Sequence, residues 1–446
     1  MGILVTFIIT LDDGLASWQA FFAFNLKKAF SAMSGDKHIA YLDNGDSTQV
    51  LPEVVDAMLP YLTESYGNPA SLHMLGLAAE EALDESRAKI AELINARPAE
   101  IVFTASATES NNIALEGLRR QHPDKKHVLI SPVEHASVRN VVKRMEKQGL
   151  VELDELTVDD NGSVSADSLR EKLRDDTLFV SIIHGNNEIG TVQDLPALAE
   201  LVHEQGAFLH ADCAQTLGKM PVDVRALGVD LASFNAHKLH GPKGVGALFV
   251  RKRLKLRRLL EGGPQEQNLR PGTENVPAIV GFAKAVEIAV RDMDTVIPQV
   301  NELTQQLAER LLEIPHVRLN GPEVGSKDRL PGNLNVTFKY IEGEAILMSL
   351  NYGGVYVSSG SACSSRSLVP SHVLTAIGLL HEEAHGSIRY TLSRLNTQAD
   401  VDLAVEQTKV AVDRLRAMTA FIPEEHSERE SEHAKTFYKQ KKEKLD

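Results

Sequence analysis

Apolar residues in the first half of the chain follow two alternating patterns. Short runs rich in β-branched and aromatic residues predict buried strands, and segments with an apolar residue every third or fourth position predict amphipathic helices. The clearest predicted strands lie at residues 100–104, 177–183 and 207–211, and the clearest helices at 77–94 and 136–148. Because strands and helices alternate, the pattern predicts an α/β fold with a largely parallel sheet flanked by helices.

A second set of elements follows a long stretch with helical periodicity, residues 278–312. Its predicted strands and helices lie at 332–340, 342–351, 354–358, 387–392 and 398–418. We therefore expect a large domain over 50–294 and a smaller C-terminal α+β domain formed by 37–49 and 295–420. Residues 421–446 are nearly all charged or polar, so they predict a charged tail with little to bury.

The first 36 residues do not continue this pattern. Residues 7–9 and 18–24 are apolar, but Asp12 and Asp13 separate them, and no apolar span reaches the ~18 residues of a transmembrane helix. The segment also lacks the basic n-region of a secretory signal and the Arg-rich, acid-free pattern of an organellar signal. We expect residues 1–36 to be a non-native or disordered extension, with Met33 as the natural start of the protein.

Composition and charge favour a globular protein of a reducing compartment. The chain has 446 residues, of which 43% are hydrophobic and 24% charged. Its formal charge of -14 opposes binding to nucleic acid, and we interpret the one dense basic run, 251–258, as solvated surface. Two cysteines cannot build a disulfide framework, so we expect a cytoplasmic protein. From the negative charge and the lack of a long apolar span, we expect it to bind neither nucleic acid nor a membrane.

Two residues at predicted strand ends indicate pyridoxal-phosphate chemistry. Asp212 closes the apolar run 207–211, and Lys238 ends another apolar run and leads into a glycine-rich turn. A pyridoxal-phosphate site needs a lysine that binds the aldehyde and, about one strand away, a carboxylate that keeps the pyridine nitrogen protonated. Taken alone, Lys238 is interpreted as a surface lysine in a loop, and its pairing with Asp212 is what favours the cofactor.

Small residues after another predicted strand suggest a place for the phosphate. The segment 104–111 passes from a strand into a helix. Backbone N–H groups at the positive helix end would face the anion there, beside the Thr108 hydroxyl. The alternative is that Ser and Thr before this helix serve only as caps.

The two cysteines have different neighbours. Cys363 lies in a run of small polar residues, 357–367, where packing does not explain a cysteine. A thiol in such a loop suits nucleophilic attack and transfer of a product. Cys213 follows a strand end between Asp212 and Ala214, and we interpret it as core packing. We predict no metal site.

Together these stretches resemble the cysteine desulfurases of the NifS/IscS type, within the class V aminotransferase group of fold-type I pyridoxal-phosphate enzymes. The resemblance runs from about residue 39 to 418, and the matching stretches are 67–71, 107–110, 134–135, 186–190, 237–238, 272–275, 358–363 and 388–389. It implies a fold-type I transferase whose large domain has a mainly parallel seven-stranded sheet between helices. The short gap between Ser361 and Ser371 resembles the NifS-like group, which has a compact reactive loop.

The resemblance also implies roles for individual residues. Lys238 would bind the cofactor covalently, Asp212 would pair with its ring nitrogen, and His135 would stack over its ring. The other implied cofactor contacts are Gln215 at the phenolic oxygen, Thr108, Ala107, His237 and Asn235 near the phosphate, Asn186, and Thr273 reaching the phosphate of the neighbouring subunit. The last contact implies a homodimer. Arg389 and Asn186 would hold the substrate carboxylate, which a guanidinium fork matches well.

The implied reaction converts L-cysteine into L-alanine and leaves the sulfur as a persulfide on Cys363. The Lys238 amine would move the Cα proton, and the Cys363 thiolate would attack the substrate sulfur, while His135 either handles a proton or only stacks. The sulfur would pass to an acceptor such as an iron–sulfur scaffold or a tRNA-modifying protein. The alternatives are a selenocysteine lyase or related cysteine-sulfinate lyase, and a catalytically inactive scaffold.

The chain departs from the family pattern at several positions. Asp46 stands where Ala is usual, Ser106 where Gly is common, and Asn235 where Ser or Cys is usual. Pro264 and Gln267 belong to a segment that lacks the His and Arg expected there. Because anion binding depends on local charge, an added carboxylate and a lost positive charge are expected to weaken cofactor binding or slow turnover.

Overall fold

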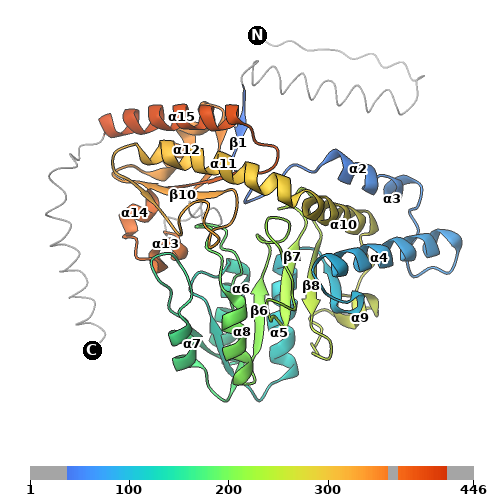
Figure 1. Ribbon diagram of the computed structural model, residues 1–446. Helices are drawn as coiled ribbons and strands as arrows, with labels where there is room; N and C mark the ends of the chain where they lie inside the picture. Colours follow the sequence, from blue (N-terminus) through green and yellow to red (C-terminus); the bar gives the residue numbers. More distant parts are fainter. Residues whose placement is uncertain (1–37, 360–369, 419–446) are drawn as a thin grey trace, which may run out of the picture. The chain divides into compact units, whose positions relative to one another are not determined.

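The computed structural model describes residues 38–359 and 370–418 (Figure 1). Three predictions fall outside the described residues: the N-terminal extension at 1–36, the reactive role of Cys363 and the charged tail at 421–446. Within the described ranges, no helix combines the length and the apolar character that crossing a membrane requires.

A seven-stranded sheet forms the centre of the fold, in the order β2-β8-β7-β6-β5-β3-β4. In that order the strands are Ile101–Thr104, Gly246–Val250, Leu231–Asn235, Phe208–Asp212, Thr177–Ser181, His127–Ile130 and Glu152–Glu155. Strand β8 runs antiparallel to both neighbours, and the other neighbouring strands pair in parallel. The predicted α/β class with a mainly parallel seven-stranded sheet is therefore confirmed.

Helices cover both faces of this sheet because successive strand residues point to opposite sides. In β2, Val102 packs into one apolar cluster, whereas Ile101 and Phe103 pack into another. Helices on the Val102 side are α5 (Ala107–Gln121) and α6 (Ala136–Lys147). On the other side lie α4 (Met74–Leu93), α7 (Ala166–Lys172), α8 (Leu195–Glu204) and α10 (Val276–Arg291).

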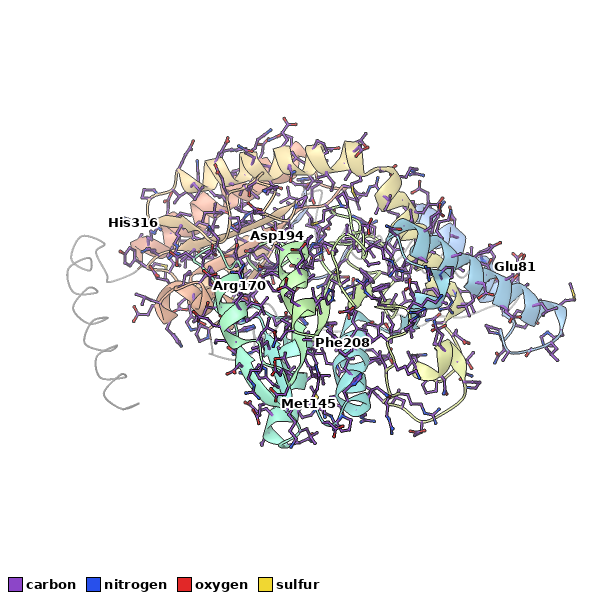
Figure 2. All side chains as sticks on the ribbon, turned by 60° about the horizontal axis from the view of Figure 1, so that its bottom comes forward. Glu81, Met145, Arg170, Asp194, Phe208 and His316 are labelled. Atoms are coloured by element: carbon purple, nitrogen blue, oxygen red, sulfur yellow. The ribbon has the colours of Figure 1, made fainter. Side chains whose placement is uncertain are left out.

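Figure 2 labels side chains on three of these helices. Met145 of α6 is fully buried in the Val102 cluster. Glu81 of α4 and Arg170 of α7 are exposed on their helices. The helices thus bury an apolar face against the sheet and leave charged residues toward solvent, as their periodicity predicts.

A smaller antiparallel sheet follows in the C-terminal part, in the order β12-β13-β10-β9. These strands are Ser358–Ser359, Ser387–Thr391, Asn333–Phe338 and Val317–Leu319. Helices α11 (Met293–Leu312), α12 (Gly343–Tyr352) and α15 (Gln398–Ala417) pack beside this sheet (Figure 1). The remaining short helices of the described chain are α2 (Pro52–Met58), α3 (Pro60–Thr63), η1 (Pro98–Glu100), α9 (Gln265–Leu269), α13 (His372–Ala376) and α14 (His381–His385).

The first described strand joins this C-terminal part rather than the central sheet. Strand β1 (Ala40–Tyr41) pairs in parallel with β11 (Val355–Tyr356). Ala40 and Leu42 are fully buried in the apolar cluster built mainly from residues 300–412. The predicted smaller C-terminal α+β part is therefore present, while the exact division of the chain into domains stays a prediction.

The stretch predicted to be helical over 278–312 is two helices. Helix α10 ends at Arg291 and α11 begins at Met293, with Asp292 between them. The Asp292 carboxylate binds the guanidinium groups of Arg291 and Arg394, which hold its pKa well below the usual range. Two cations therefore bind Asp292 at the junction of the two helices.

The backbone before α10 is unusual at three consecutive residues. Glu266, Gln267 and Asn268 have φ of 46°, 58° and 64°, in the left-handed region that costs L-residues roughly 1–2 kcal/mol each. The buried Glu266 carboxylate accepts hydrogen bonds from Arg87 at 2.9 and 2.7 Å and from the Phe103 backbone N–H at 2.6 Å. These contacts to α4 and β2 hold the strained turn in place.

We expect Glu266→Ala to lower the free energy of unfolding by about 3–5 kcal/mol, because the Arg87 side chain, 13% exposed, would lose its carboxylate partner. Urea unfolding followed by circular dichroism measures this loss. Glu261→Ala is the matched control, since its ion pair with Arg258 involves a carboxylate that is 79% exposed and should change stability by less than about 1 kcal/mol. Equal losses in the two variants would contradict the anchoring role of Glu266.

Candidate active site

A cavity of about 380 Å³ opens at the carboxyl ends of the parallel strands. Its size lies within the ~300–1,000 Å³ range of small-molecule sites, and α/β sheets bind ligands at this edge. The lining residues are Asp46, Ser106, Ala107, Thr108, His135, Ser137, Ile183, Asn187, Asp212, Ala214, Gln215, Asn235, His237 and Lys238. Residues predicted to form the site, from the four stretches 107–108, 135, 212–215 and 235–238, therefore meet around one cavity.

Asp212 and Lys238 reach this cavity from neighbouring strands. Asp212 is the last residue of β6 and pairs in register with Ser233 of β7, and Lys238 follows the end of β7 by three residues. The Asp212 side chain is 3% exposed. Its two oxygens accept hydrogen bonds from the Ala214 N–H at 3.0 Å and from the Asn111 amide at 2.8 Å. The carboxylate is thus buried, oriented and able to hold a protonated ring nitrogen.

His135 is linked to Asp212 through two polar side chains. Its Nδ1 lies 2.7 Å from the Ser137 hydroxyl, which accepts a hydrogen bond from the Asn111 amide at 2.8 Å. The Ser137 backbone N–H also donates to Nδ1 at 3.1 Å, so the ring proton is assigned to Nε2. Burial lowers the pKa of His135, although the Asp212 charge opposes this, and the ring is neutral at neutral pH. A neutral ring suits stacking over a cofactor.

The first turn of α5 forms one wall of the cavity. Ser106 caps the helix by accepting a hydrogen bond from the Glu109 N–H at 3.2 Å, and the N–H groups of Ala107 and Thr108 have no acceptor within the helix. Gly246 allows this close packing, since a Cβ there would lie 2.8 Å from the Ser106 carbonyl carbon. The N-terminus of α5 is therefore suited to binding an anionic group.

Two further residues complete this end of the cavity. Burial, followed by the charges of Lys238 and Lys243, lowers the pKa of His237 to about 4, so its imidazole is neutral at neutral pH. Asn235 is 3% exposed, and its Oδ1 has no hydrogen-bond partner among the described residues. A buried polar atom without a partner normally indicates a ligand or water. The amine, the carboxylate and the anion-binding helix end together fit pyridoxal phosphate.

Gln215 is fixed at both ends of its amide. Its Nε2 donates to the Gly45 carbonyl at 2.9 Å, and its Oε1 accepts from Lys219 Nζ at 2.7 Å. Burial, followed by repulsion from Lys238 and Arg389, lowers the pKa of Lys219 to about 7. The amide therefore presents its donor group toward the N-terminal segment that contains Asp46.

Arg389, predicted to hold the substrate carboxylate, is fully buried in β13. Its Nη2 donates to Asp43 at 3.0 Å and to Asp46 at 2.8 Å, and its Nη1 donates to the Asn187 carbonyl at 3.1 Å. Asp46 lines the cavity, so Arg389 is connected to it through this carboxylate. The predicted contact of Arg389 with a substrate stays a prediction.

Asn186 and Asn187 have different surroundings. The Asn186 amide donates to the Val133 carbonyl at 2.9 Å and accepts from the N–H groups of Glu188 and Ile189, so it is used within the chain. The neighbouring Asn187 lines the cavity. The role predicted for Asn186 stays a prediction. Of the two asparagines, Asn187 is the one that lies on the cavity wall.

Two of the remaining residues named in the sequence analysis, Thr273 and Cys213, do not line this cavity. Thr273 is exposed in the segment before α10 and does not line the cavity, and its contact with a neighbouring subunit stays a prediction. Cys363 lies outside the described residues. Cys213 is fully buried in the main apolar cluster, where burial raises the pKa of its thiol, so it is a packing residue as expected.

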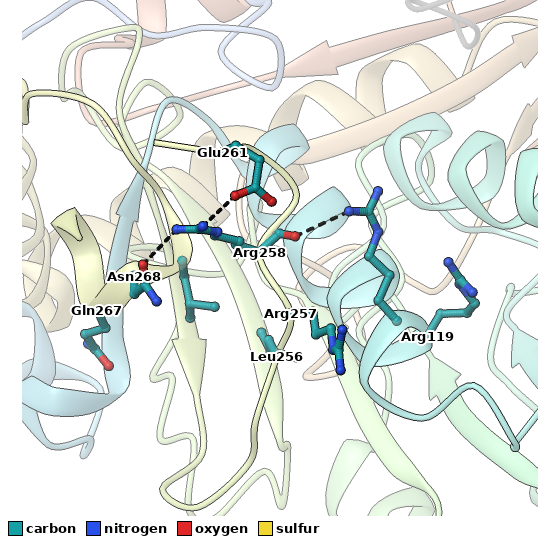
Figure 3. A pocket seen from close by; sticks show the side chains of 9 residues that line it. Arg119, Leu256, Arg257, Arg258, Glu261, Gln267 and Asn268 are labelled. Carbon is teal, nitrogen blue, oxygen red and sulfur yellow. Dashed lines mark hydrogen bonds and ion pairs between the residues drawn. The ribbon is translucent and has the colours of Figure 1, made fainter. Parts of the chain in front are cut away.

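A larger hollow of about 580 Å³ lies elsewhere and is rich in arginine (Figure 3). It is lined by Arg119, Arg120, Leu256, Arg257, Arg258, Glu261, Gln267, Asn268 and Leu269. Arg258 binds Glu261 at 2.5 Å and Asn268 at 2.9 Å, and Arg120 donates to the Arg258 carbonyl at 3.3 Å. Neither Lys238 nor Asp212 lines this hollow, so the smaller cavity is the candidate active site.

Besides Asn187, the structure adds Asn111, Ser137 and Lys219 to the residues expected at the site. Asn111 follows Thr108 by three positions and so shares its helix face, which is a signal that could have indicated it. Lys219 follows its partner Gln215 by four positions, so its spacing is also a local signal. The Ser137 hydroxyl binds Asn111, 26 positions earlier, and a contact between such distant residues leaves no pattern in the sequence.

Comparisons with known proteins agree with this geometry. Residues 40–404 match the family model described as Aminotransferase class-V. Cysteine desulfurase IscS of Methanosarcina thermophila is 45% identical over 395 residues, which cover 88% of this chain and 97% of that protein. Cysteine desulfurase IscS 1 of Archaeoglobus fulgidus is 47% identical over 381 residues, which cover 85% of this chain and 98% of that protein.

Solved structures give the same relationship. A NifS-like protein superposes with a TM-score of 0.79 and 35% identity, over 85% of this chain and 100% of that one. The structure of SspA in complex with cysteine superposes with a TM-score of 0.70 and 34% identity, over 80% of this chain and 100% of that one. Comparisons of sequence and of fold therefore relate this chain to cysteine desulfurases and NifS-like proteins.

We expect Asn111→Ala to weaken the affinity for pyridoxal phosphate by about tenfold or more, because Asp212 would lose a charge-assisted hydrogen bond of roughly 1.5–3 kcal/mol. Titration of the apoprotein with the cofactor, followed by absorbance, measures this. Asn112→Ala is the matched control, since the Asn112 amide donates to the Thr108 carbonyl rather than to Asp212. Equal affinities in the wild type and both variants would show that Asn111 does not orient Asp212.

Proposed function

Because this chain belongs to the class V aminotransferase family, we propose that it is a cysteine desulfurase that takes sulfur from L-cysteine, releases L-alanine and carries the sulfur on Cys363. The observation that carries the proposal is the meeting of Lys238 and Asp212 at one cavity, from adjacent parallel strands. An amine and a buried carboxylate in this relation are what pyridoxal phosphate requires of a protein.

The residues around the cavity would hold the cofactor by its charged and polar groups. Lys238 would bind the aldehyde, Asp212 the ring nitrogen and Gln215 the phenolic oxygen. The phosphate would lie against Ala107 and Thr108 at the start of α5, with His237, Asn235 and the partner subunit's Thr273 beside it. When bound, pyridoxal phosphate supplies a ring that accepts the electron pair released at Cα of the substrate.

The substrate L-cysteine would be oriented by its carboxylate. Arg389 offers a guanidinium fork, and Asn186 is proposed beside it. This contact would place the substrate Cα near Lys238, whose amine would take the Cα proton. His135 is neutral, and its Nε2–H would donate to the cofactor or to the substrate thiol.

The sulfur transfer itself balances without an external oxidant. The Cys363 thiolate would attack the substrate sulfur, so a sulfur–sulfur bond forms while the carbon–sulfur bond of the substrate breaks. The electron pair of the broken bond stays on carbon, which takes a proton and leaves as part of L-alanine. The products are alanine and a persulfide on Cys363.

Three finer features belong to the same proposal. We propose a homodimer, because Thr273 would serve the cavity of the partner. We propose a cytoplasmic location, because a reduced Cys363 is needed for every turnover. We propose an acceptor protein for the persulfide sulfur, with an iron–sulfur scaffold as the first candidate and a tRNA-modifying protein as the second.

Incubation of the holoenzyme with L-cysteine should add one sulfur atom to the peptide that contains Cys363, and mass spectrometry after proteolysis measures it. Cys213→Ser should keep this modification, since Cys213 is the other cysteine of the chain and is fully buried. Cys363→Ser should lose the modification and the release of sulfide while keeping the absorbance of the bound cofactor. Selenium release that survives in Cys363→Ser, with no sulfur transfer in the wild type, would instead favour a selenocysteine lyase.

Lys238→Ala should lose the visible absorbance of the covalently bound cofactor, and alanine formation from cysteine should fall by at least about 100-fold, because the variant lacks the amine that moves the Cα proton. Absorbance spectra and an alanine assay measure the two effects. A variant that kept both properties would contradict the assignment of Lys238, and a wild type with neither would favour the inactive scaffold.

A further inference from the structure

Asp46 occupies an unusual position between the candidate active site and Arg389. It lines the cavity that contains Lys238, and its Oδ1 accepts a hydrogen bond from Arg389 Nη2 at 2.8 Å. The Asp46 side chain is 43% exposed, whereas the Arg389 side chain is completely buried. A carboxylate of the protein itself is therefore the group through which Arg389 meets the cavity.

The local fold determines this contact. Asp46 belongs to a turn in which its N–H donates to the Asp43 carbonyl at 3.1 Å. The Gly45 N–H donates to the Thr391 hydroxyl at 2.7 Å, and this bond fixes the turn against β13. Thr391 and Arg389 are two residues apart on that strand, so their side chains share one face. The turn thus brings Asp46 next to the guanidinium.

The donors of Arg389 are largely engaged. Nη2 binds both Asp43 and Asp46, and Nη1 binds the Asn187 carbonyl, while Nε has no partner among the described residues. A carboxylate can bind a guanidinium in a two-point manner through Nη1 and Nη2 or through Nε and Nη2. Both arrangements require Nη2, which already binds two carboxylates. The substrate carboxylate therefore binds there only after one of the aspartates leaves.

Of the two aspartates, Asp46 is the one able to leave. Asp43 does not line the cavity, its side chain is 22% exposed, and its backbone bridges to Thr391. Burial, followed by repulsion from Asp46, raises the pKa of Asp43 to about 6. Asp46 lines the cavity, and its side chain is 43% exposed. The acid at position 46, where the resembled family usually has Ala, thus competes with the substrate.

We propose that Asp46 is a specificity-determining residue whose carboxylate occupies the place on Arg389 that an amino-acid substrate's carboxylate must take. This inference rests on the proposed function, because it uses Arg389 as the substrate's anchor. Each binding event then exchanges one guanidinium–carboxylate pair for another. The net binding free energy contributed by the substrate carboxylate is therefore small, and the enzyme binds free L-cysteine weakly.

Asp46→Ala tests the proposal in the holoenzyme. The KM for L-cysteine should fall about tenfold, because the substrate would no longer displace a charge-assisted hydrogen bond. The dissociation constant of the product L-alanine, measured from the absorbance of the bound cofactor, should fall by a similar factor. Cysteamine, which is cysteine without its carboxylate, should bind with a dissociation constant that changes less than about twofold, since it makes no use of Arg389.

Two further variants make the result specific. Asp46→Asn keeps the size of the side chain and removes its charge, so its KM should lie between those of the wild type and Asp46→Ala. Asp56→Ala removes an exposed carboxylate of α2 and should leave the KM unchanged. Thermal melting verifies that each variant is folded. If Asp46→Ala is not folded, the KM of Asp46→Asn alone tests the proposal.

Contrary results separate the two proposals. A wild type that forms alanine from cysteine, with a KM that is unchanged or raised in Asp46→Ala, overturns the role of Asp46 and leaves the desulfurase assignment intact. An equal change for cysteamine and L-cysteine also overturns it, since the effect would not concern the carboxylate. A wild type that forms no alanine overturns both.

Discussion

The parallel pairing of β6 with β7 is the constraint on which the rest of the site depends. It aligns the carboxyl ends of the two strands, so Asp212 and the segment leading to Lys238 reach the same edge of the sheet. Asp212 is nearly completely buried, and its charge is stabilised by the Asn111 amide and the Ala214 N–H. The helix that carries Asn111, α5, also forms the cavity wall that we propose binds the phosphate, so one helix contributes to both ends of the cavity.

Much of this arrangement could be predicted because its signals are local. Apolar runs indicated the strands, and their ends indicated Asp212 and Lys238, since parallel strands present their carboxyl ends together. The network that joins Asp212 to His135 through Ser137 could not be predicted, because hydrogen bonds between distant segments leave no periodic pattern. The break at Asp292 was missed for a related reason: both helices have good periodicity, and the residue between them is fixed by distant Arg394.

The departures from the resembled family have different structural consequences. Ser106 has an extended backbone with φ of -174°, which any residue adopts, and its hydroxyl caps α5. Gln267 lacks a positive charge, but its amide donates to the Ile101 carbonyl at 3.0 Å, and so it supports the strained turn. Asp46 differs from both because it adds a charge beside a buried cation. Ser106 and Gln267 are therefore accommodated by local geometry, whereas Asp46 alters the electrostatics of the cavity.

The pairing of β1 with β11 links the order of synthesis to the order of folding. Ala40 and Leu42 leave the ribosome early, whereas Val355 and the other members of their apolar cluster are made much later. Until those residues emerge, the two early side chains have no cluster to enter, and contacts of such wide sequence separation form slowly. The strands of the central sheet are made first, and the C-terminal layer closes only after β13 and α15 have been made, so β1 stays unpaired until late in synthesis.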